Sequence, residues 1–188
     1  TYSIKISASS IDENKIKNDV EAILDSINMD MSTYIDSSSI SKFNNFPLGI
    51  KYPLSNDFYE VINFSKHFYD MTDEKFDITI NPLVQLWGFS KDTHLEKLPS
   101  KNQIDSTLQY IGMNNLIIQP DKSIRKKREL TIDLSAIAKG YAVDRLSEYL
   151  NKVNLKNHMV EIGGEVRASG KSNEKKDWII GLQNPESI

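Results

Sequence analysis

The hydrophobic and polar positions of this chain repeat with two different periods, and each period predicts a different element. In residues 2–6 every second side chain is apolar, which is typical of a strand with one buried face. Residues 16–31 place apolar side chains three or four positions apart, which predicts a helix with one buried face. The same spacing predicts a second helix after Ser55, which would cap it, with Phe68 among its buried residues.

The middle of the chain combines strand-like alternation with a proline. Residues 76–81 alternate apolar and polar side chains, which predicts a strand that ends at Pro82. Residues 83–89 are too apolar for an exposed loop, and we expect them to form core or the wall of a pocket. Asp77 is unusual on such a strand, because a buried carboxylate needs a partner.

The second half of the chain predicts one short helix and several strands joined by turns. The helix is expected at residues 105–111, with Gly112 as its C-cap. The Gly163-Gly164 pair between two apolar runs predicts a tight turn or a close approach by another group. The strands expected here are residues 116–119, 123–127, 159–162, 165–168 and 178–182.

Residues 130–150 contain both periods, and the predicted fold is organised around them. Residues 130–134 alternate as a strand, and Ser135 then takes the position of a helix N-cap. Backbone N–H groups are unpaired at such a junction and the helix dipole favours negative charge, so a phosphate fits there. An ordinary buried helix with a simple cap explains the same pattern, and the residues alone leave both interpretations open.

The fold class follows from two predicted hairpins, at residues 116–127 and 160–168. Alternating strands and helices are compatible with a parallel α/β sheet, but hairpins require antiparallel neighbours. We therefore expect an α+β fold in which antiparallel sheets pack against helices. The chain has no internal repeat and no linker-like segment, so residues 1–188 are expected to belong to a single domain.

Composition excludes several classes of function. The 39% hydrophobic content is that of a globular chain, and a net charge of −3 with mixed signs argues against nucleic-acid binding. With no cysteine there are no disulfides and no thiolate metal sites. No apolar run reaches membrane-spanning length. The glycine–lysine loop of nucleotide-binding ATPases, the dinucleotide fingerprint GxGxxG and the zinc motif HExxH are missing from the sequence.

Five segments together resemble a known family. No single segment decides the matter, but they occur in the family's order and span nearly the whole chain. The chain is similar to the ApbE family, the FAD:protein FMN transferases once called thiamine biosynthesis lipoproteins. The five segments are MSTYIDSSSISKFN, FDITINPLVQLWGF, IDLSAIAKGYAVDRL, VEIGGEVRASG and WIIGLQNP.

The resemblance implies a fold, a reaction and a metal. The fold would be a sandwich of helices and antiparallel sheets built from a duplicated unit. The reaction would be a magnesium-dependent transfer of FMN from FAD to a threonine or serine hydroxyl of a target flavoprotein, with release of AMP. Two alternatives stay open: an FAD-binding or storage protein, and an FAD pyrophosphatase that forms FMN and AMP without labelling a protein.

The family's site residues can be matched to positions of this chain. Ala136 matches the residue that offers its main-chain oxygen to Mg²⁺, and a carbonyl is a suitable hard ligand for that ion. Trp87 is expected to pack against a ring of FAD. The turn Gly163-Gly164-Glu165 is expected to form another wall of the FAD pocket. The positions that match FAD contacts are Tyr34, Lys75, Phe76, Asp77, Asp133 and Lys139.

The resemblance also implies partners and a location. The family's histidine, aspartate and threonine have no counterpart before Ile188, so we expect the chain to be incomplete at its C-terminus and to need the remaining C-terminal part of the same protein. The other partners would be FAD and a flavin-accepting subunit of a respiratory or redox complex. A lipid anchor upstream of Thr1 would hold the protein at the periplasmic side of the bacterial inner membrane, as a lipoprotein.

Overall fold

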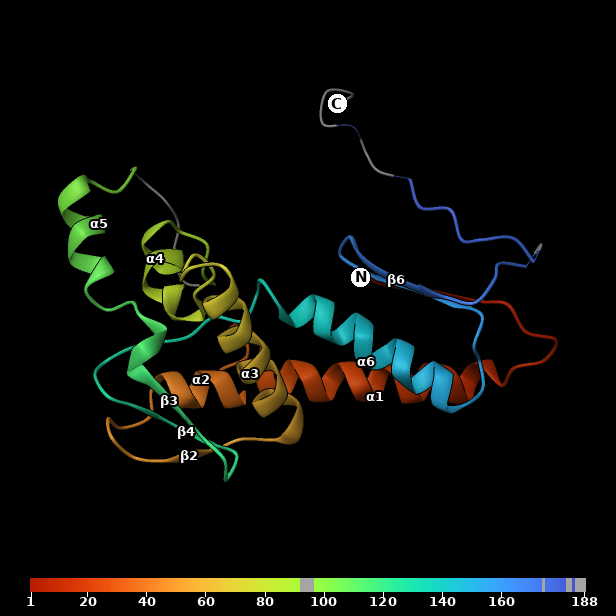
Figure 1. Ribbon diagram of the computed structural model, residues 1–188, viewed down its shortest axis with the longest axis horizontal. Helices are drawn as coiled ribbons and strands as arrows, with labels where there is room; N and C mark the ends of the chain where they lie inside the picture. The colour runs from red at the N-terminus through yellow and green to blue at the C-terminus, as the bar shows by residue number, and fades with distance from the viewer. Residues whose placement is uncertain (92–96, 174, 182–183, 185–188) are drawn as a thin grey trace. The chain divides into compact units, whose positions relative to one another are not determined.

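The protein is described by a computed structural model, which covers residues 1–91, 97–173, 175–181 and 184. The chain forms two compact units, Thr1–Ile23 with Lys139–Ile188, and Leu24–Ala138. Each unit contains one three-stranded antiparallel sheet together with helices (Figure 1). The α+β prediction is confirmed, whereas the assignment of residues 1–188 to a single domain stays a prediction.

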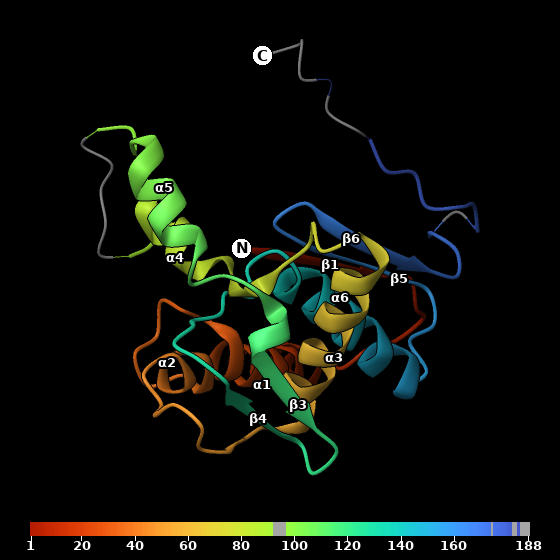
Figure 2. The same cartoon turned by 60° about the vertical axis from the view of Figure 1, so that its left-hand side comes forward.

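The sheet of the first unit has the strand order β1-β5-β6, and helices lie along one of its faces (Figure 2). In its register Ile4 lies opposite Val160, and Val160 lies opposite Arg167. The three strands occur where the alternation of the sequence predicts them. The elements of this unit are β1 (Tyr2–Ile6), β5 (His158–Ile162), β6 (Glu165–Ser169), α6 (Ala138–Lys152) and the first part of α1 (Glu13–Met31).

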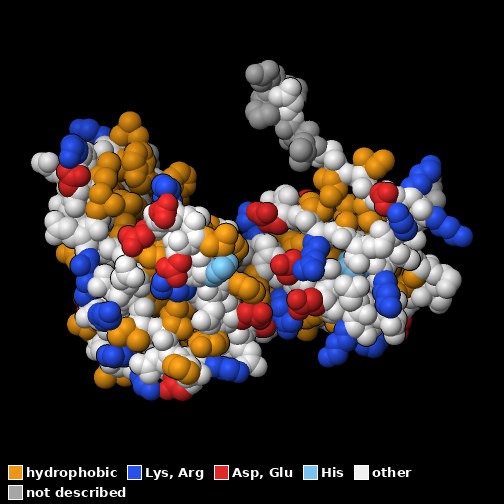
Figure 3. Space-filling model, viewed as in Figure 1, with side chains coloured by type: hydrophobic (Ala, Val, Ile, Leu, Met, Phe, Trp, Pro, Cys, Tyr) orange, Lys and Arg blue, Asp and Glu red, His pale blue; other side chains and the backbone are white. Residues whose placement is uncertain are grey.

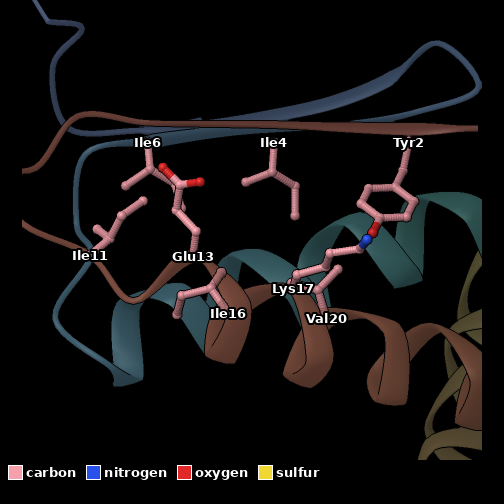
Figure 4. Close-up of a pocket in the computed structure, with 8 residues that line it drawn as sticks. All are labelled: Tyr2, Ile4, Ile6, Ile11, Glu13, Ile16, Lys17 and Val20. Carbon is pink, nitrogen blue, oxygen red and sulfur yellow. The ribbon is translucent and has the colours of Figure 1, made fainter.

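Alternation along β1 directs one set of its side chains toward α1. Tyr2, Ile4 and Ile6 project from the strand toward the helix, where Ile16 and Val20 project toward the strand (Figure 4). These residues line a groove of about 300 Å³. The period of two in the strand and the spacing of four in the helix therefore produce one shared apolar surface.

A buried histidine links α6 to β5. His158 is fully buried, with Nδ1 2.7 Å from the carbonyl oxygen of Leu155 and Nε2 2.8 Å from Oγ of Ser147. Because a carbonyl can only accept, we assign the ring proton to Nδ1, and Nε2 then accepts from the serine hydroxyl. Both ring nitrogens are satisfied inside the protein, so His158 has a structural role.

The second unit contains the sheet β2-β4-β3 and most of the helices. The hairpin predicted for residues 116–127 is confirmed, and its edge is extended by a two-residue strand that the sequence did not predict. Ser55 caps α3 as expected, since its hydroxyl oxygen accepts from the backbone N–H of Phe58. The elements are α2 (Ser39–Asn44), β2 (Tyr52–Pro53), α3 (Asn56–Met71), the 3₁₀ helix η1 (Ile78–Ile80), α4 (Asn81–Leu86), α5 (Lys101–Leu108), η2 (Met113–Asn115), β3 (Leu116–Gln119) and β4 (Ser123–Lys126).

The strand predicted for residues 76–81 is wrong, because this segment starts two helices. The Asp77 carboxylate accepts a hydrogen bond of 2.7 Å from the backbone N–H of Thr79 and so caps η1. α4 follows at once, with Pro82 in its first turn, where a missing N–H costs nothing. Two helix-start signals in a row outweigh the alternation of apolar residues.

The strand predicted for residues 130–134 is also wrong, although its apolar side chains are buried as expected. In the part of the chain that the structure describes, these residues belong to neither sheet. Asn44 and Ile78, which lie on no strand, supply hydrogen-bond partners for their backbone. Ser135 is not an N-cap either: it begins a turn at residues 135–137, and α6 starts at Ala138.

Three smaller predictions need correction. α5 spans Lys101–Leu108 rather than residues 105–111, because Ser100 and Gln103 form a capping box that fixes an earlier start. Phe68 is 41% exposed instead of buried. Residues 178–181 form no strand, and residue 182 of that predicted strand lies outside the described residues.

Gly170, the residue after β6, lies in a closely packed part of the first unit. Gly170 has φ +65°, and a Cβ added there would lie 2.2 Å from Oδ1 of Asn157 and 2.7 Å from the carbonyl oxygen of Lys156. We expect Gly170→Ala to lower the free energy of unfolding by more than about 1 kcal/mol, measured by urea denaturation.

The matched control is the helical Gly140, where an added Cβ meets nothing within 4 Å. Gly140→Ala should raise the free energy of unfolding by about 0.5–1 kcal/mol, because alanine loses less conformational freedom in a helix. Equal effects at the two positions would contradict the packing described around Gly170.

Candidate functional site

A polar pocket in the second unit surrounds one of the predicted site residues. It has a volume of about 240 Å³ and is lined from α2, α4, the loop after α1 and the segment 130–134. Hydroxyl, amide and carboxylate groups dominate its wall, so it can donate and accept hydrogen bonds in several directions. The residues that line it include Ser41, Asn44, Asn81, Gln85, Thr131 and Asp133.

Asp133 is the acidic residue that the sequence singled out, and the structure holds it in a defined position. Asp133 is 8% exposed, and its Oδ1 accepts a hydrogen bond of 2.7 Å from the backbone N–H of Ser135. Its own N–H donates to the carbonyl oxygen of Ile78 at 2.8 Å. A carboxylate has about four acceptor sites, so this single bond orients the group without exhausting it.

Tyr34 lies beside the same pocket. It is 62% exposed, and its hydroxyl donates a long hydrogen bond of 3.4 Å to the carbonyl oxygen of Phe89, a residue of the pocket wall. An exposed phenol ring tethered through its hydroxyl is a suitable surface for a planar ring.

The apolar segment 83–89 forms part of the pocket wall, one of the two expected outcomes. Val84 and Gln85 of α4 line the pocket, together with Phe89. The surface over α4 and α5 is rich in hydrophobic side chains (Figure 3). The exposed ones include Trp87, Phe89, Leu98, Leu108 and Tyr110.

In the first unit the structure brings together Lys139 and the glycine turn. The turn joins β5 to β6 through two residues, Gly163 with φ +57° and Gly164 with φ +96°, as a tight hairpin requires. A Cβ on Gly163 would lie 3.4 Å from Cδ of Lys139, and Nζ of Lys139 is 3.8 Å from Oε1 of Glu165. The lysine therefore lies over the turn with a carboxylate as its partner.

Comparison with known proteins assigns the chain to a family. The model of the ApbE family matches residues 1–188, the full length of the sequence. The chain belongs to the ApbE family. It is 36% identical to the FAD:protein FMN transferase of Haemophilus influenzae over 176 residues, which cover 91% of this chain and 51% of that protein. It is 32% identical to the enzyme of the same name from Vibrio cholerae, over 98% of this chain and 56% of that protein.

Solved ApbE structures share the fold. The flavin transferase ApbE from Vibrio cholerae superposes with a TM-score of 0.93 at 30% identity, over 98% of this chain and 60% of that one. The apo form of the Pseudomonas stutzeri flavinyl transferase ApbE gives 0.90 at 30% identity, over 96% and 61%. The chain thus spans about half the length of the curated relatives it matches.

Ala136 is the position that the sequence predicts as a ligand of Mg²⁺. It lies in the turn before α6, and its role as a metal ligand stays a prediction. Mg²⁺ requires six oxygen ligands in near-ideal octahedral geometry. Among residues 1–91, 97–173, 175–181 and 184, no three His, Cys, Asp or Glu side chains lie together. Mg²⁺ in proteins is usually held by one or two carboxylates together with waters and substrate phosphates.

The other predicted residues of this ApbE chain divide into structural and exposed ones. The Asp77 carboxylate accepts from the backbone N–H and the hydroxyl of Thr79 at 2.7 and 2.6 Å, and from the N–H of Met113 at 3.1 Å. It therefore joins η1 to η2, which answers why a carboxylate occurs in an apolar segment. Phe76 packs against Phe68, with ring centroids 5.9 Å apart. Lys75 is exposed, and Trp87 ends α4 at the surface.

Two amide side chains of the pocket were missed by sequence reasoning. The side chain of Asn44 contacts the backbone of Ile132, and Nδ2 of Asn81 donates to Oγ1 of Thr131 at 2.9 Å. Asn81 and Thr131 occur inside apolar runs, which is the signal that drew attention to Asp77 and could have drawn it to them. Asn44 follows a polar stretch and gives no such signal.

The described helices give no indication of a membrane span, because none combines the length and the apolar character that crossing a bilayer demands.

The structural role of Asp77 can be measured directly. Asp77→Ala leaves the donors of Thr79 and Met113 without their acceptor, so we expect the free energy of unfolding to fall by about 1–3 kcal/mol in urea denaturation. The control is Asp25→Ala on an exposed position of α1, where the change should stay within about 0.5 kcal/mol. Unchanged stability in Asp77→Ala would contradict a structural role.

Proposed function

We propose that this chain belongs to an FAD:protein FMN transferase. The observation that supports this most directly is the match of all 188 residues to the ApbE family, together with relatives at 36% and 32% identity that carry that name. The polar pocket around Asp133 gives the proposal a physical basis, because FAD offers many hydroxyl, amide and amino groups for hydrogen bonding.

The proposed reaction exchanges the phosphoanhydride bond of the FAD diphosphate for a phosphoester bond to the target protein. The hydroxyl oxygen of a threonine or serine in the target protein attacks the phosphorus on the FMN side of the FAD diphosphate. The bond from that phosphorus to the bridging oxygen breaks, AMP leaves, and the hydroxyl proton passes to a base. Catalysis of such a transfer depends on positioning the two reactants and on neutralising the diphosphate charge.

The residues of this chain are assigned binding and orienting roles in the proposal. Asp133 accepts hydrogen bonds from FAD, Tyr34 and Trp87 offer ring surfaces, and Lys139 offers positive charge to the diphosphate. Lys75, Phe76 and Asp77 contribute their backbone and the Phe76 ring, since the Asp77 carboxylate already has protein donors. The Gly163-Gly164-Glu165 turn allows close approach. Magnesium is part of the proposal, and Ala136 would offer it a carbonyl oxygen.

The partners and the location are proposed on the family resemblance alone. The acceptor is a protein subunit of a respiratory or redox complex, and the remaining C-terminal part of the same protein contributes the other metal ligands and the family histidine. A lipid anchor holds the protein at the periplasmic side of the bacterial inner membrane.

One incubation separates transfer from its alternatives. The product of the complete gene is incubated with FAD, Mg²⁺ and a threonine-containing acceptor peptide, and both peptide fluorescence and AMP are measured. We expect a fluorescent peptide and an equal amount of AMP. AMP without labelling indicates that water replaces the hydroxyl and the protein is a pyrophosphatase, and binding of FAD without either product indicates storage.

Two controls belong to this incubation. A peptide with valine in place of the threonine should stay unlabelled, because it lacks the attacking hydroxyl. Removal of Mg²⁺ with EDTA should stop both products.

The contribution of Asp133 to FAD binding can be tested against a matched acid. Asp133→Ala should weaken FAD binding by about tenfold or more, as expected for a lost hydrogen bond to a charged group. The control Asp121→Ala removes an exposed carboxylate in the β3–β4 turn, which pairs with Lys51 at 2.6 Å and accepts from the hydroxyl of Ser123 at 2.6 Å. Such surface pairs contribute little, so its FAD affinity should be unchanged. Equal affinities of the two variants by titration would remove Asp133 from the site.

A further inference from the structure

The side chain of Asn44 holds the backbone of Ile132 with two hydrogen bonds. Nδ2 of Asn44 donates to the carbonyl oxygen of Ile132 at 2.9 Å, and the N–H of Ile132 donates to Oδ1 of Asn44 at 2.8 Å. A neighbouring β-strand would make the same pair of bonds to a residue of an extended segment. One amide side chain therefore takes the place of a strand.

The next residue of the chain is fixed from another element. The N–H of Asp133 donates to the carbonyl oxygen of Ile78 at 2.8 Å, and its carboxylate accepts from the N–H of Ser135 at 2.7 Å. The peptide unit between Ile132 and Asp133 is therefore held on both sides: Ile78 accepts from its N–H, and Asn44 donates to its carbonyl oxygen.

Asn44 is itself anchored by a buried cation. Lys126 is 2% exposed, its Nζ donates to the main-chain oxygen of Asn44 at 2.8 Å, and it lies 5.2 Å from the ring centroid of Phe43. A cation is favoured at the C-terminal end of a helix and over an aromatic face, and Asn44 is the last residue of α2. Burial lowers the pKa of Lys126 below its usual value, and the nearby Glu129 carboxylate offsets only part of this shift.

Both Asn44 and Asp133 line the polar pocket, so the bonds to Ile132 lie at its wall. We propose that Asn44 is a positioning residue for Asp133: it holds the peptide unit that precedes Asp133, and Lys126 holds Asn44. The inference rests on the proposed function for the identity of the ligand, FAD.

A double-mutant cycle tests whether Asn44 acts through Asp133. FAD affinity is measured for the product of the complete gene as wild type, Asn44→Leu, Asp133→Ala and the double variant. Asn44→Leu keeps the approximate shape but cannot form either bond, and it should weaken binding by about tenfold. In the Asp133→Ala background the same change should weaken binding by less than about threefold. Fully additive effects would overturn the positioning role, since a general loss of stability does not depend on Asp133.

The second readout needs no ligand. Amide hydrogen exchange in residues 130–135 should accelerate in Asn44→Leu, because the N–H of Ile132 loses its acceptor, while exchange in α3 stays unchanged. The control is Asn63→Leu on α3, where the amide donates to the carbonyl oxygen of Tyr59 at the surface and segment 130–135 should stay protected. Unchanged exchange in Asn44→Leu would contradict the proposal.

Lys126→Met is the fallback should Asn44→Leu not fold. It leaves the Asn44 side chain in place and removes only its anchor, so exchange in residues 130–135 should rise above the wild-type rate. Exchange at the wild-type rate would overturn the role of Lys126. The two levels of inference fail separately. A wild-type protein that binds no FAD overturns the proposed function, whereas wild-type binding with additive variants overturns the positioning role alone.

Discussion

The structure of the second unit depends on the hydrogen-bond partners of the backbone of residues 130–134. Most of these residues are buried and, in the described part of the chain, they belong to neither sheet, so other elements must supply the partners. A buried peptide group without a partner costs free energy comparable to a lost hydrogen bond, and this segment is buried at Leu130, Ile132 and Leu134. Asn44 and the carbonyl of Ile78 supply the partners. As a consequence α2, η1 and the segment that bears Asp133 meet at one place, and α2 and that segment also line the polar pocket.

The fold class and most elements could be predicted because their signals are local. Alternation in residues 2–6, the hairpin of residues 116–127 and the Gly163-Gly164 turn each depend on a few neighbouring side chains, and all are confirmed. The errors occur where a second local signal competes. Residues 76–81 alternate like a strand, yet the cap at Asp77 and the proline at 82 both favour a helix start, and the helix forms.

The candidate site could be predicted only in part, because its carboxylate side chains are recognisable in the sequence and its amide side chains are not. Asp77 stands out because a carboxylate in an apolar run requires an explanation, and Asp133 because it matches an FAD contact of the family. The explanations differ: Asp77 is bound by Thr79 and Met113, whereas Asp133 lies at the pocket. Only tertiary contacts separate these two roles. Asn44 contacts Ile132 across 88 positions of sequence, and no short-range pattern reports such a contact.

The ion pair between Lys139 and Glu165 has a kinetic consequence. Both side chains are about half exposed and their charged atoms are 3.8 Å apart, so water screens the attraction. Exposed side chains change rotamer within picoseconds to nanoseconds. The ammonium group of Lys139 can therefore leave Glu165 and return to it on the timescale of a rotamer change, and each return brings it back over the glycine turn.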